Sequence, residues 1–142
     1  MADNVNENDQ ITDVDPGPTV DTDGIYNSIK LMLGMEPDYK AFDTDIIVHI
    51  NTALAKLTQI GVGPKTGYEL DLVDPTTSKW EDFLGNDASK VLNMVKTYVY
   101  IQVKLVFDPP QNSFTQDLLK KEAEELVWRI NVEADDWSHT EG

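Results

Sequence analysis

The chain of 142 residues contains few of the side chains that act as nucleophiles, general bases or transition-metal ligands. It has no cysteine and only two histidines, His49 and His139. Zinc sites built from thiolates and disulfide scaffolds both require cysteine, so these two classes are excluded. Neither histidine belongs to a His-x-x-x-His or Glu-x-x-His motif, so the sequence offers no metal site. His49 lies beside an apolar helical stripe, where a lone histidine is usually a packing or surface residue.

Two segments superficially resemble ligand-binding loops. Residues 61–67 contain Gly-x-Gly and Lys-Thr, but the spacing of a phosphate-binding loop is absent and Pro64 stands before the lysine. Residues 13–24 contain closely spaced aspartates, but the full calcium-loop pattern ending in glutamate is missing. The sequence therefore predicts no catalytic residue, no cofactor and no metal, and we do not expect an enzyme.

The charge of the chain is strongly acidic and unevenly distributed. There are 26 Asp and Glu residues against 11 Lys and Arg residues, which gives a formal net charge of −15. Residues 1–24 hold seven acids and residues 131–142 hold four, with no base in either segment, so the middle holds 15 acids and all 11 bases. A protein that binds DNA by neutralising phosphates needs a basic surface, and this composition argues against one.

The sequence also argues against a membrane segment. The longest uninterrupted apolar run is Tyr98–Ile101, whereas a membrane-spanning helix needs roughly 20 residues. The first residues lack the basic start and the apolar core of a signal peptide, so we expect none.

Apolar side chains recur at helical spacing in four segments. Residues that favour helix ends flank these segments. The predicted helices cover residues 23–35, capped by Asp23; 44–60, capped by Asp43 or Thr44 and ended by Gly61; 87–106, ended by Asp108-Pro109-Pro110; and 113–130, opened by a Ser113–Gln116 capping box.

The segment 87–106 is apolar on most of its sides. A helix of this kind is buried on most sides, so we expect it to be the central helix or to face a neighbouring subunit. Its β-branched residues would also suit a strand, but the segment is too long for one.

Residues 61–86 interrupt the helical pattern with glycine and proline turns. Tyr68, Leu70 and Leu72 alternate with acidic residues, which indicates a short half-exposed strand or hairpin arm. A helical turn is predicted at 78–84. Because large apolar side chains are frequent here, we expect the segment to fold back on the core or to contact another chain.

Together these elements predict an all-α fold. It is a compact bundle of about four helices with an irregular or short β-hairpin excursion between the second and third helices, and with disordered acidic termini. The expected organisation is an acidic tail at 1–24, a helical domain at 25–131 and an acidic tail at 132–142. The first tail either solvates the protein or orders on a partner, and Trp137 in the second is either incidental or an anchor for a partner.

Three stretches of the sequence resemble the head-tail connector (adaptor, or head-completion) proteins of tailed bacteriophages, over roughly residues 25–131. The stretches are Asp45–Leu54 with Leu57–Gly63, Trp80–Gly85, and Val95–Pro110 continuing to Glu124–Asn131. The most specific feature is a buried helix ending in Phe-Asp-Pro-Pro (107–110), followed by a capped helix ending in Trp-Arg-Ile-Asn (128–131).

The resemblance implies a structural subunit of the virion with no active site. Such subunits form a ring, often dodecameric, beneath the portal at the capsid vertex. The ring extends the DNA channel, through which DNA passes without specific binding, and it docks the next neck or tail component. The implied partners are further copies of the chain, the portal protein and a stopper or tail-side neck protein, with assembly in the host cytoplasm.

Two other functions stay open: another neck protein (stopper or tail completion), and an acidic DNA-mimic inhibitor, which would need its acids on a folded face. For the connector, the helix at 87–106 and the excursion at 61–86 are expected to supply much of the subunit contact. The last helix, leading into Trp137, is the candidate for portal contact. The candidate interface residues are Tyr68, Leu70, Leu72, Trp80, Phe83, Tyr100, Val103, Phe107, Trp128 and Trp137.

Overall fold

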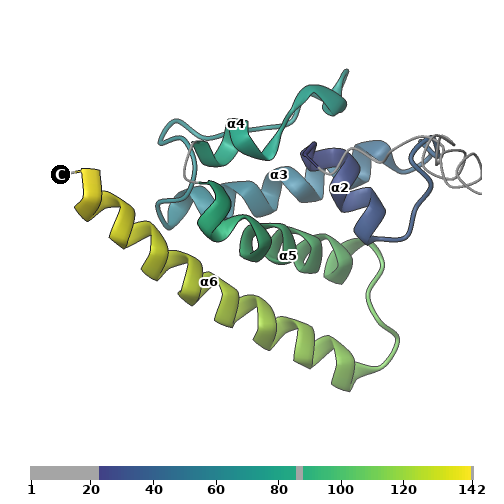
Figure 1. The fold of residues 1–142 in the computed structure, drawn as a ribbon. Coiled ribbons are helices and arrows are strands. Elements are labelled where there is room, and N and C mark those ends of the chain that lie inside the picture. The colour runs from purple at the N-terminus through teal and green to yellow at the C-terminus, as the bar shows by residue number, and fades with distance from the viewer. Residues whose placement is uncertain (1–22, 86–87, 142) are drawn as a thin grey trace, which may run out of the picture.

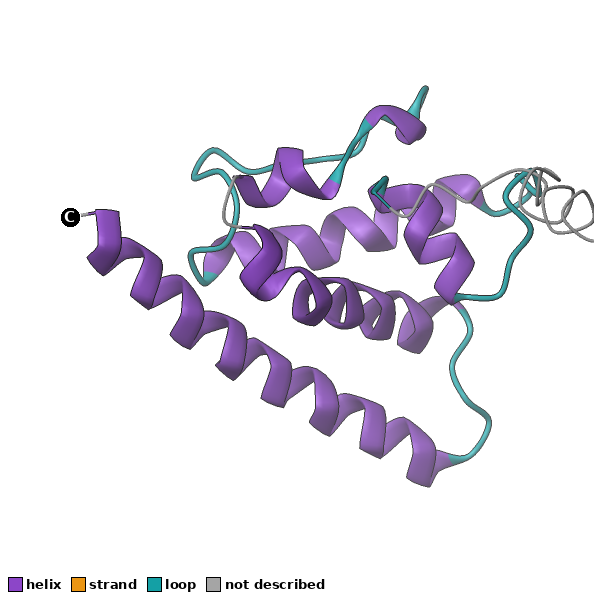
Figure 2. Ribbon diagram, viewed as in Figure 1, coloured by secondary structure: helices purple, strands orange, loops and turns teal. Residues whose placement is uncertain are grey.

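The structure is a computed structural model that describes residues 23–85 and 88–141, with the side chains of residues 23–85 and 90–133. This part of the chain contains five α-helices and one 3-10 helix, and no strand (Figures 1 and 2). The elements are α2 (Ile25–Met32), α3 (Asp43–Gln59), η1 (Pro75–Thr77), α4 (Trp80–Leu84), α5 (Ala88–Phe107) and α6 (Ser113–Glu141). The predicted all-α class is confirmed. The excursion was expected to be either irregular or a short β-hairpin, and its described part is irregular with short helices.

The helix α5 is the centre of the bundle. It lies between α3 and α6 and also contacts α2 and α4 (Figure 1). Its buried side chains lie on more than one side of the helix: Val91, Val95, Tyr98, Val99, Ile101 and Val103. Because β-branched residues lower intrinsic helix propensity, burial against four other helices is what stabilises α5. Of the two expected positions for this segment, the central one is observed within the subunit.

The excursion between α3 and α5 folds back on the core. Val62 is fully buried, and its N–H donates to the Leu57 carbonyl at 3.0 Å. Farther along, the N–H of Leu70 donates to Oδ1 of Asn51 at 2.8 Å, which ties irregular backbone to the side of α3. The short helix α4 is predicted correctly and follows η1. Of the two expected alternatives for this segment, packing on the core is the one observed within the subunit.

Hydrogen bonds join the start of α2 to the start of α4. The N–H of Ile25 donates to the Ser78 carbonyl at 3.0 Å, and the N–H of Trp80 donates to the Asp23 carbonyl at 2.9 Å. The indole Nε1 of Trp80 donates to Oγ of Ser28 at 2.8 Å. Since Trp80 and Ser28 are both buried, these bonds satisfy polar groups that water cannot reach.

The starts of the first two described helices differ from the predicted caps. Gly24 is the N-cap of α2 and Phe42 is the N-cap of α3, and neither end has a side-chain cap. The predicted caps at Asp23 and at Asp43 or Thr44 are therefore wrong. Asp43 is instead the first residue of α3, where its carboxylate is engaged by α2.

The start of α6 is capped one residue earlier than predicted. Oδ1 of Asn112 accepts a hydrogen bond from the N–H of Phe114 at 2.7 Å, while the Gln116 side chain donates to the Pro110 carbonyl. The predicted Ser113–Gln116 capping box is wrong, because Asn112 supplies the acceptor that the first turn needs. At its other end α6 continues to Glu141, through most of the segment expected as an acidic tail. Residues 1–22 of the expected N-terminal tail lie outside the described residues.

Candidate interaction surfaces

The described side chains include one histidine, His49, and no cysteine. No group of three or more His, Cys, Asp or Glu side chains among them could hold a metal ion. His49 is half-buried on α3. Across residues 23–85 and 88–141, no helix combines the length and the apolar character that crossing a bilayer requires.

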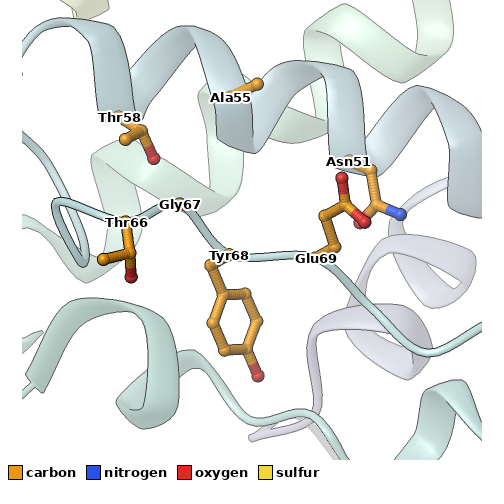
Figure 3. Close-up of a pocket in the computed structure, with 7 residues that line it drawn as sticks. All are labelled: Asn51, Ala55, Thr58, Thr66, Gly67, Tyr68 and Glu69. Atoms are coloured by element: carbon orange, nitrogen blue, oxygen red, sulfur yellow. The ribbon is translucent and has the colours of Figure 1, made fainter.

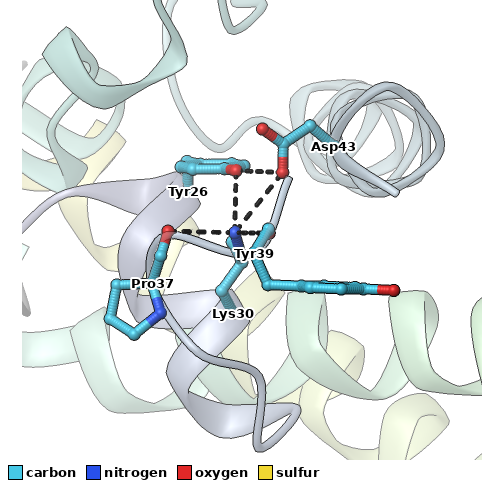
Figure 4. A network of polar contacts seen from close by, with 5 residues as sticks. All are labelled: Tyr26, Lys30, Pro37, Tyr39 and Asp43. Carbon is cyan, nitrogen blue, oxygen red and sulfur yellow. Dashed lines mark hydrogen bonds and ion pairs between the residues drawn. The ribbon is translucent and has the colours of Figure 1, made fainter. Parts of the chain in front are cut away.

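A fully buried lysine, Lys30 of α2, organises the turn between α2 and α3 (Figure 4). Its Nζ donates to the carbonyl of Pro37 at 3.1 Å and to the carbonyl of Tyr39. The same Nζ lies 3.4 Å from Oδ1 of Asp43 and 3.1 Å from the hydroxyl of Tyr26. The Tyr26 hydroxyl in turn donates to the Asp43 carboxylate. The network therefore joins α2, the turn and the first residue of α3.

The electrostatics of this network hold Tyr26 in its neutral form. Burial raises the pKa of Tyr26 above its usual range, and the adjacent Asp43 carboxylate raises it further. A phenolate at this place would lose hydration and face a negative charge. Since the charges of Lys30 and Asp43 are paired with each other, we interpret the network as one that positions the turn rather than a ligand.

The turn that Lys30 holds exposes two aromatic side chains, Tyr39 and Phe42. The ring of Phe42 meets the ring of Phe107 edge-on, with centroids 5.4 Å apart, and lies 6.0 Å from the ring of Tyr39. We call Tyr39, Phe42 and Phe107 the aromatic end patch. Tyr39 and Phe42 remain 49% and 43% exposed. Aromatic rings that cluster and stay exposed are typical of surfaces that meet a partner.

A second surface runs along α6 on the side away from α5. The buried residues of α6, Ala123, Leu126 and Ile130, face the bundle. In Figure 1 the bundle lies on one side of α6 only. The opposite side, here called the outer face of α6, carries six exposed residues: Phe114, Leu118, Lys121, Glu125, Trp128 and Val132. Its four apolar members are between 42% and 68% exposed.

A groove lies between α3 and residues 66–69 of the excursion (Figure 3). Its volume is about 280 Å³, and it is lined by Asn51, Ala55, Thr58, Thr66, Gly67, Tyr68 and Glu69. The lining has one carboxylate but no histidine, lysine or cysteine, so it lacks a nucleophile paired with a base.

The ten predicted interface residues fall into different environments. Four are buried within the subunit at 3% exposure or less: Leu70, Trp80, Phe83 and Val103. Three are half-buried: Tyr68, Tyr100 and Phe107. Leu72 and Trp128 are well exposed, at 59% and 67%. The side chain of Trp137 lies outside the described residues. The structure brings Phe107 into the aromatic end patch and places Trp128 on the outer face of α6.

Sequence reasoning missed Tyr39 and Phe42, which flank the turn before α3. A signal for them exists, because two aromatic residues in a polar segment between helices lack an obvious place in the core. It also missed Lys30 and Asn51, whose roles depend on contacts between segments distant in the sequence. No local pattern distinguishes such residues from solvated ones.

Comparison with known proteins adds one finding to this geometry. A family described as "Phage connector protein" matches residues 25–136, which covers α2 to α5 and most of α6. No curated protein and no solved structure matches the chain. The proteins of this family are structural rather than catalytic, in agreement with the surfaces described above. The chain therefore belongs to the phage connector protein family and is a structural protein of the phage virion.

Proposed function

We propose that this connector protein is the adaptor of the phage neck, a subunit of a closed ring beneath the portal. The observation that carries the proposal is a subunit with a closed core that still exposes separate apolar surfaces. The outer face of α6 and Leu72 of the excursion lie on different parts of the subunit, and both leave apolar side chains exposed. A ring needs this property, because its heterologous contacts join one face of each copy to a different face of the next.

The structure supports a particular choice of ring contact. The helix α5 is covered by helices of its own subunit, and four of the candidate residues are buried. The contact is accordingly assigned to the outer face of α6 on one copy and to the excursion on the next. Leu72 is exposed on the excursion, and Tyr68 lines the groove beside α3.

The distribution of charge supports a role as a channel segment. Between residues 25 and 130 the chain carries 15 acids and 11 bases, so the helical domain is close to balanced. DNA binds strongly where a protein neutralises many phosphates, and a balanced or acidic channel wall avoids this attraction. The ring is expected to let DNA pass and to show negligible DNA binding at physiological salt.

The end of α6 is the proposed portal contact. Ile130 is the last buried residue of α6 among those described, whereas the helix continues to Glu141. A helix that extends beyond the core of its subunit can reach a second protein. Trp137 lies in this extension, and tryptophan is enriched among residues that dominate binding energy.

The mass of the protein in solution, alone and mixed with assembled portal, tests the proposal. Native mass spectrometry is expected to show several copies bound per portal, in a number set by the portal's symmetry. A protein that stays strictly monomeric in the presence of assembled portal would contradict the proposal. A complex with a tail-side neck protein but not with portal would instead identify a stopper.

A further inference from the structure

The outer face of α6 has the spacing of a helix-pairing seam. Its six residues, Phe114, Leu118, Lys121, Glu125, Trp128 and Val132, are separated by steps of four and three residues in strict alternation. This is the spacing of the a and d positions of a heptad, which face a partner helix. At 3.6 residues per turn the six side chains fall within an arc of about 80°. All six are exposed.

The seam is symmetric in chemical character about its centre. Residues at equal distances from the centre are either both apolar or of opposite charge. Ala123 marks its centre, with Lys121 and Glu125 on either side. Leu118 and Trp128 are the next pair outward, and Phe114 and Val132 are the outermost pair. An antiparallel pair of identical helices, with its two-fold axis at residue 123, would therefore place apolar against apolar and Lys121 against Glu125.

A parallel pair of the same helices would lack this match. It would set Lys121 against Lys121 and Glu125 against Glu125 of the second copy, and like charges at such positions oppose pairing. The seam is thus complementary to itself in the antiparallel direction only. Self-complementarity is the property of an isologous two-fold contact, so the fitting occupant is a second copy of this chain.

The surface beside Leu118 is also hollowed where the antiparallel pair needs it. A depression of about 350 Å³ is lined by Phe114, Asp117, Leu118, Lys120, Lys121 and Glu124. In helix pairs of this kind, each seam residue of one helix enters a hole formed by four residues of the other. Residues 114, 117, 118 and 121 have the spacing of such a hole, and the residue of the second copy opposite Leu118 is Trp128.

We propose that α6 of the free subunit pairs with α6 of a second copy in antiparallel orientation, with the Trp128 indole of each copy in the hollow beside Leu118 of the other. The seam spans 18 residue steps, or about 27 Å of helix. A contact of this length lies at the small end of specific interfaces, so the dimer is weak, with a dissociation constant on the order of 10 µM.

The proposed dimer does not depend on the proposed function. Its effect on ring assembly, however, rests on that function. If the outer face of α6 also forms the ring contact, the same face cannot serve both contacts at once. In the free protein, the dimer would then bury Trp128. Assembly on the portal would have to displace this dimer. Failure of the dimer leaves the ring untouched, and failure of the ring leaves the dimer untouched, so the two results are separable.

Sedimentation equilibrium of the full chain between about 5 and 200 µM is the first test. At about 0.15 M salt the screening length is about 8 Å, which limits the repulsion between two acidic subunits. The expected result is a monomer–dimer equilibrium that Trp128→Ala weakens at least 30-fold, since a tryptophan buried in a contact often dominates its binding energy. The matched control is Val73→Ala on the excursion, where Val73 is 92% exposed. A monomer at 200 µM, or a dimer that Trp128→Ala leaves unchanged, would overturn the proposal.

Charge exchange at the centre of the seam tests the orientation. Lys121→Glu and Glu125→Lys each create like-charge contacts across the two-fold axis and should weaken the dimer several-fold. The double variant restores the opposite pairing, with the same net charge as the starting protein, and should restore the dimer. Circular dichroism checks that the helix survives loss of the Glu125–Arg129 ion pair. A double variant that dimerises no better than the weaker single variant would refute the antiparallel register.

Disulfide formation gives an independent readout, because the chain contains no cysteine of its own. Leu118→Cys and Trp128→Cys proteins, distinguished by a mass tag and mixed, should form the mixed disulfide in preference to either self-disulfide. In the antiparallel pair, position 118 lies about 15 Å along the axis from position 118 of the second copy. A disulfide requires Cα atoms within about 7 Å. Predominant self-disulfides at position 118 would show a parallel pair and reject the proposal.

Discussion

Lys30 is a charged residue with no exposed surface, and its ammonium is satisfied by groups from three parts of the chain. Burying an unpaired charge costs several kcal/mol, so the position depends on the Asp43 carboxylate and on the two turn carbonyls. The same bonds fix the turn from which Tyr39 and Phe42 project. The buried Lys30 thereby sets the positions of the exposed Tyr39 and Phe42 in the aromatic end patch.

Replacing Lys30 by methionine should lower the free energy of unfolding by about 3 kcal/mol. The substitution keeps the apolar stem but leaves Asp43 and the turn carbonyls without their donor. Urea unfolding followed by circular dichroism measures the loss. Lys40→Met is the matched control, because Lys40 is exposed in the same turn region, and it should change stability by less than about 0.5 kcal/mol. Equal losses in both variants would contradict the role given to Lys30.

Gly63 shows how one backbone position controls the packing of the excursion. It has a φ of +83°, and a Cβ placed on it would lie 2.4 Å from the ring of Phe83. Gly67 has a similar φ of +93° but no atom within 4 Å of such a Cβ. Both positions are strained for an L side chain, and only Gly63 adds a steric conflict.

Gly63→Ala should therefore destabilise the protein by about 3 kcal/mol, and Gly67→Ala by about 1 kcal/mol. The difference reports the displacement of the buried Phe83 ring, because the strain from positive φ is common to both variants. Thermal or urea unfolding of the pair gives the comparison. Indistinguishable stabilities would show that Phe83 can move at no cost.

At the scale of elements, the two long faces of α6 differ in burial. Leu126 is 7% exposed and faces α5, whereas Leu118 is 50% exposed on the outer face. Leu126→Ala should cost about 2–3 kcal/mol of stability, since it removes buried methyl groups and leaves a cavity. Leu118→Ala, the same substitution on the same helix, should stay within about 0.5 kcal/mol. Unfolding of the two variants at low protein concentration separates the faces, and a comparable loss in both would show that Leu118 belongs to the core.

Deletion of the end of α6 tests the proposed portal contact. Deleting residues 132–142 spares Ala123, Leu126 and Ile130, so the unfolding midpoint should change little. Affinity for portal should fall at least tenfold, because the deletion removes Trp137 and the helical extension. Trp137→Ala in the full chain separates the tryptophan from the rest. Unchanged portal affinity in both variants would reject the proposed portal contact.

The helices could be predicted from the sequence because burial of one helix face requires apolar residues at helical spacing, and this spacing is visible in the local sequence. The apolar stripe of α3 and the nearly all-round apolar character of α5 placed both helices to within a few residues. The caps could not be predicted in this way. Asp23, Thr44 and Ser113 are good capping residues, but the N-cap positions fall on Gly24 and Phe42, and Asn112 provides the cap of α6.

The surfaces were harder to predict than the helices. Large apolar residues of the excursion suggested an interface, yet Trp80 and Phe83 close the core and leave Leu72 outside. Size and hydrophobicity favour a core position and an interface position equally, so only the packing distinguishes them. The network of Lys30 depends on residues that meet through the fold, and no local pattern could reveal it.

At the scale of the whole molecule, the charge distribution and the exposed apolar surfaces are both consistent with a subunit that assembles with other proteins. Eleven of the excess acids lie in residues 1–24 and 131–142, which leaves the helical domain nearly balanced in charge. The apolar surfaces of that domain are then free to meet neighbours. Membership of the phage connector family places those neighbours in the head and tail of the virion.

The most direct test is an image of this protein bound to the assembled portal. Electron cryomicroscopy of the complex should show a closed ring of subunits coaxial with the portal channel, with α6 at the contact between adjacent copies. The DNA path should run through the centre of the ring. Isolated subunits attached at scattered positions, or a portal with no bound protein at saturating concentration, would contradict the adaptor function.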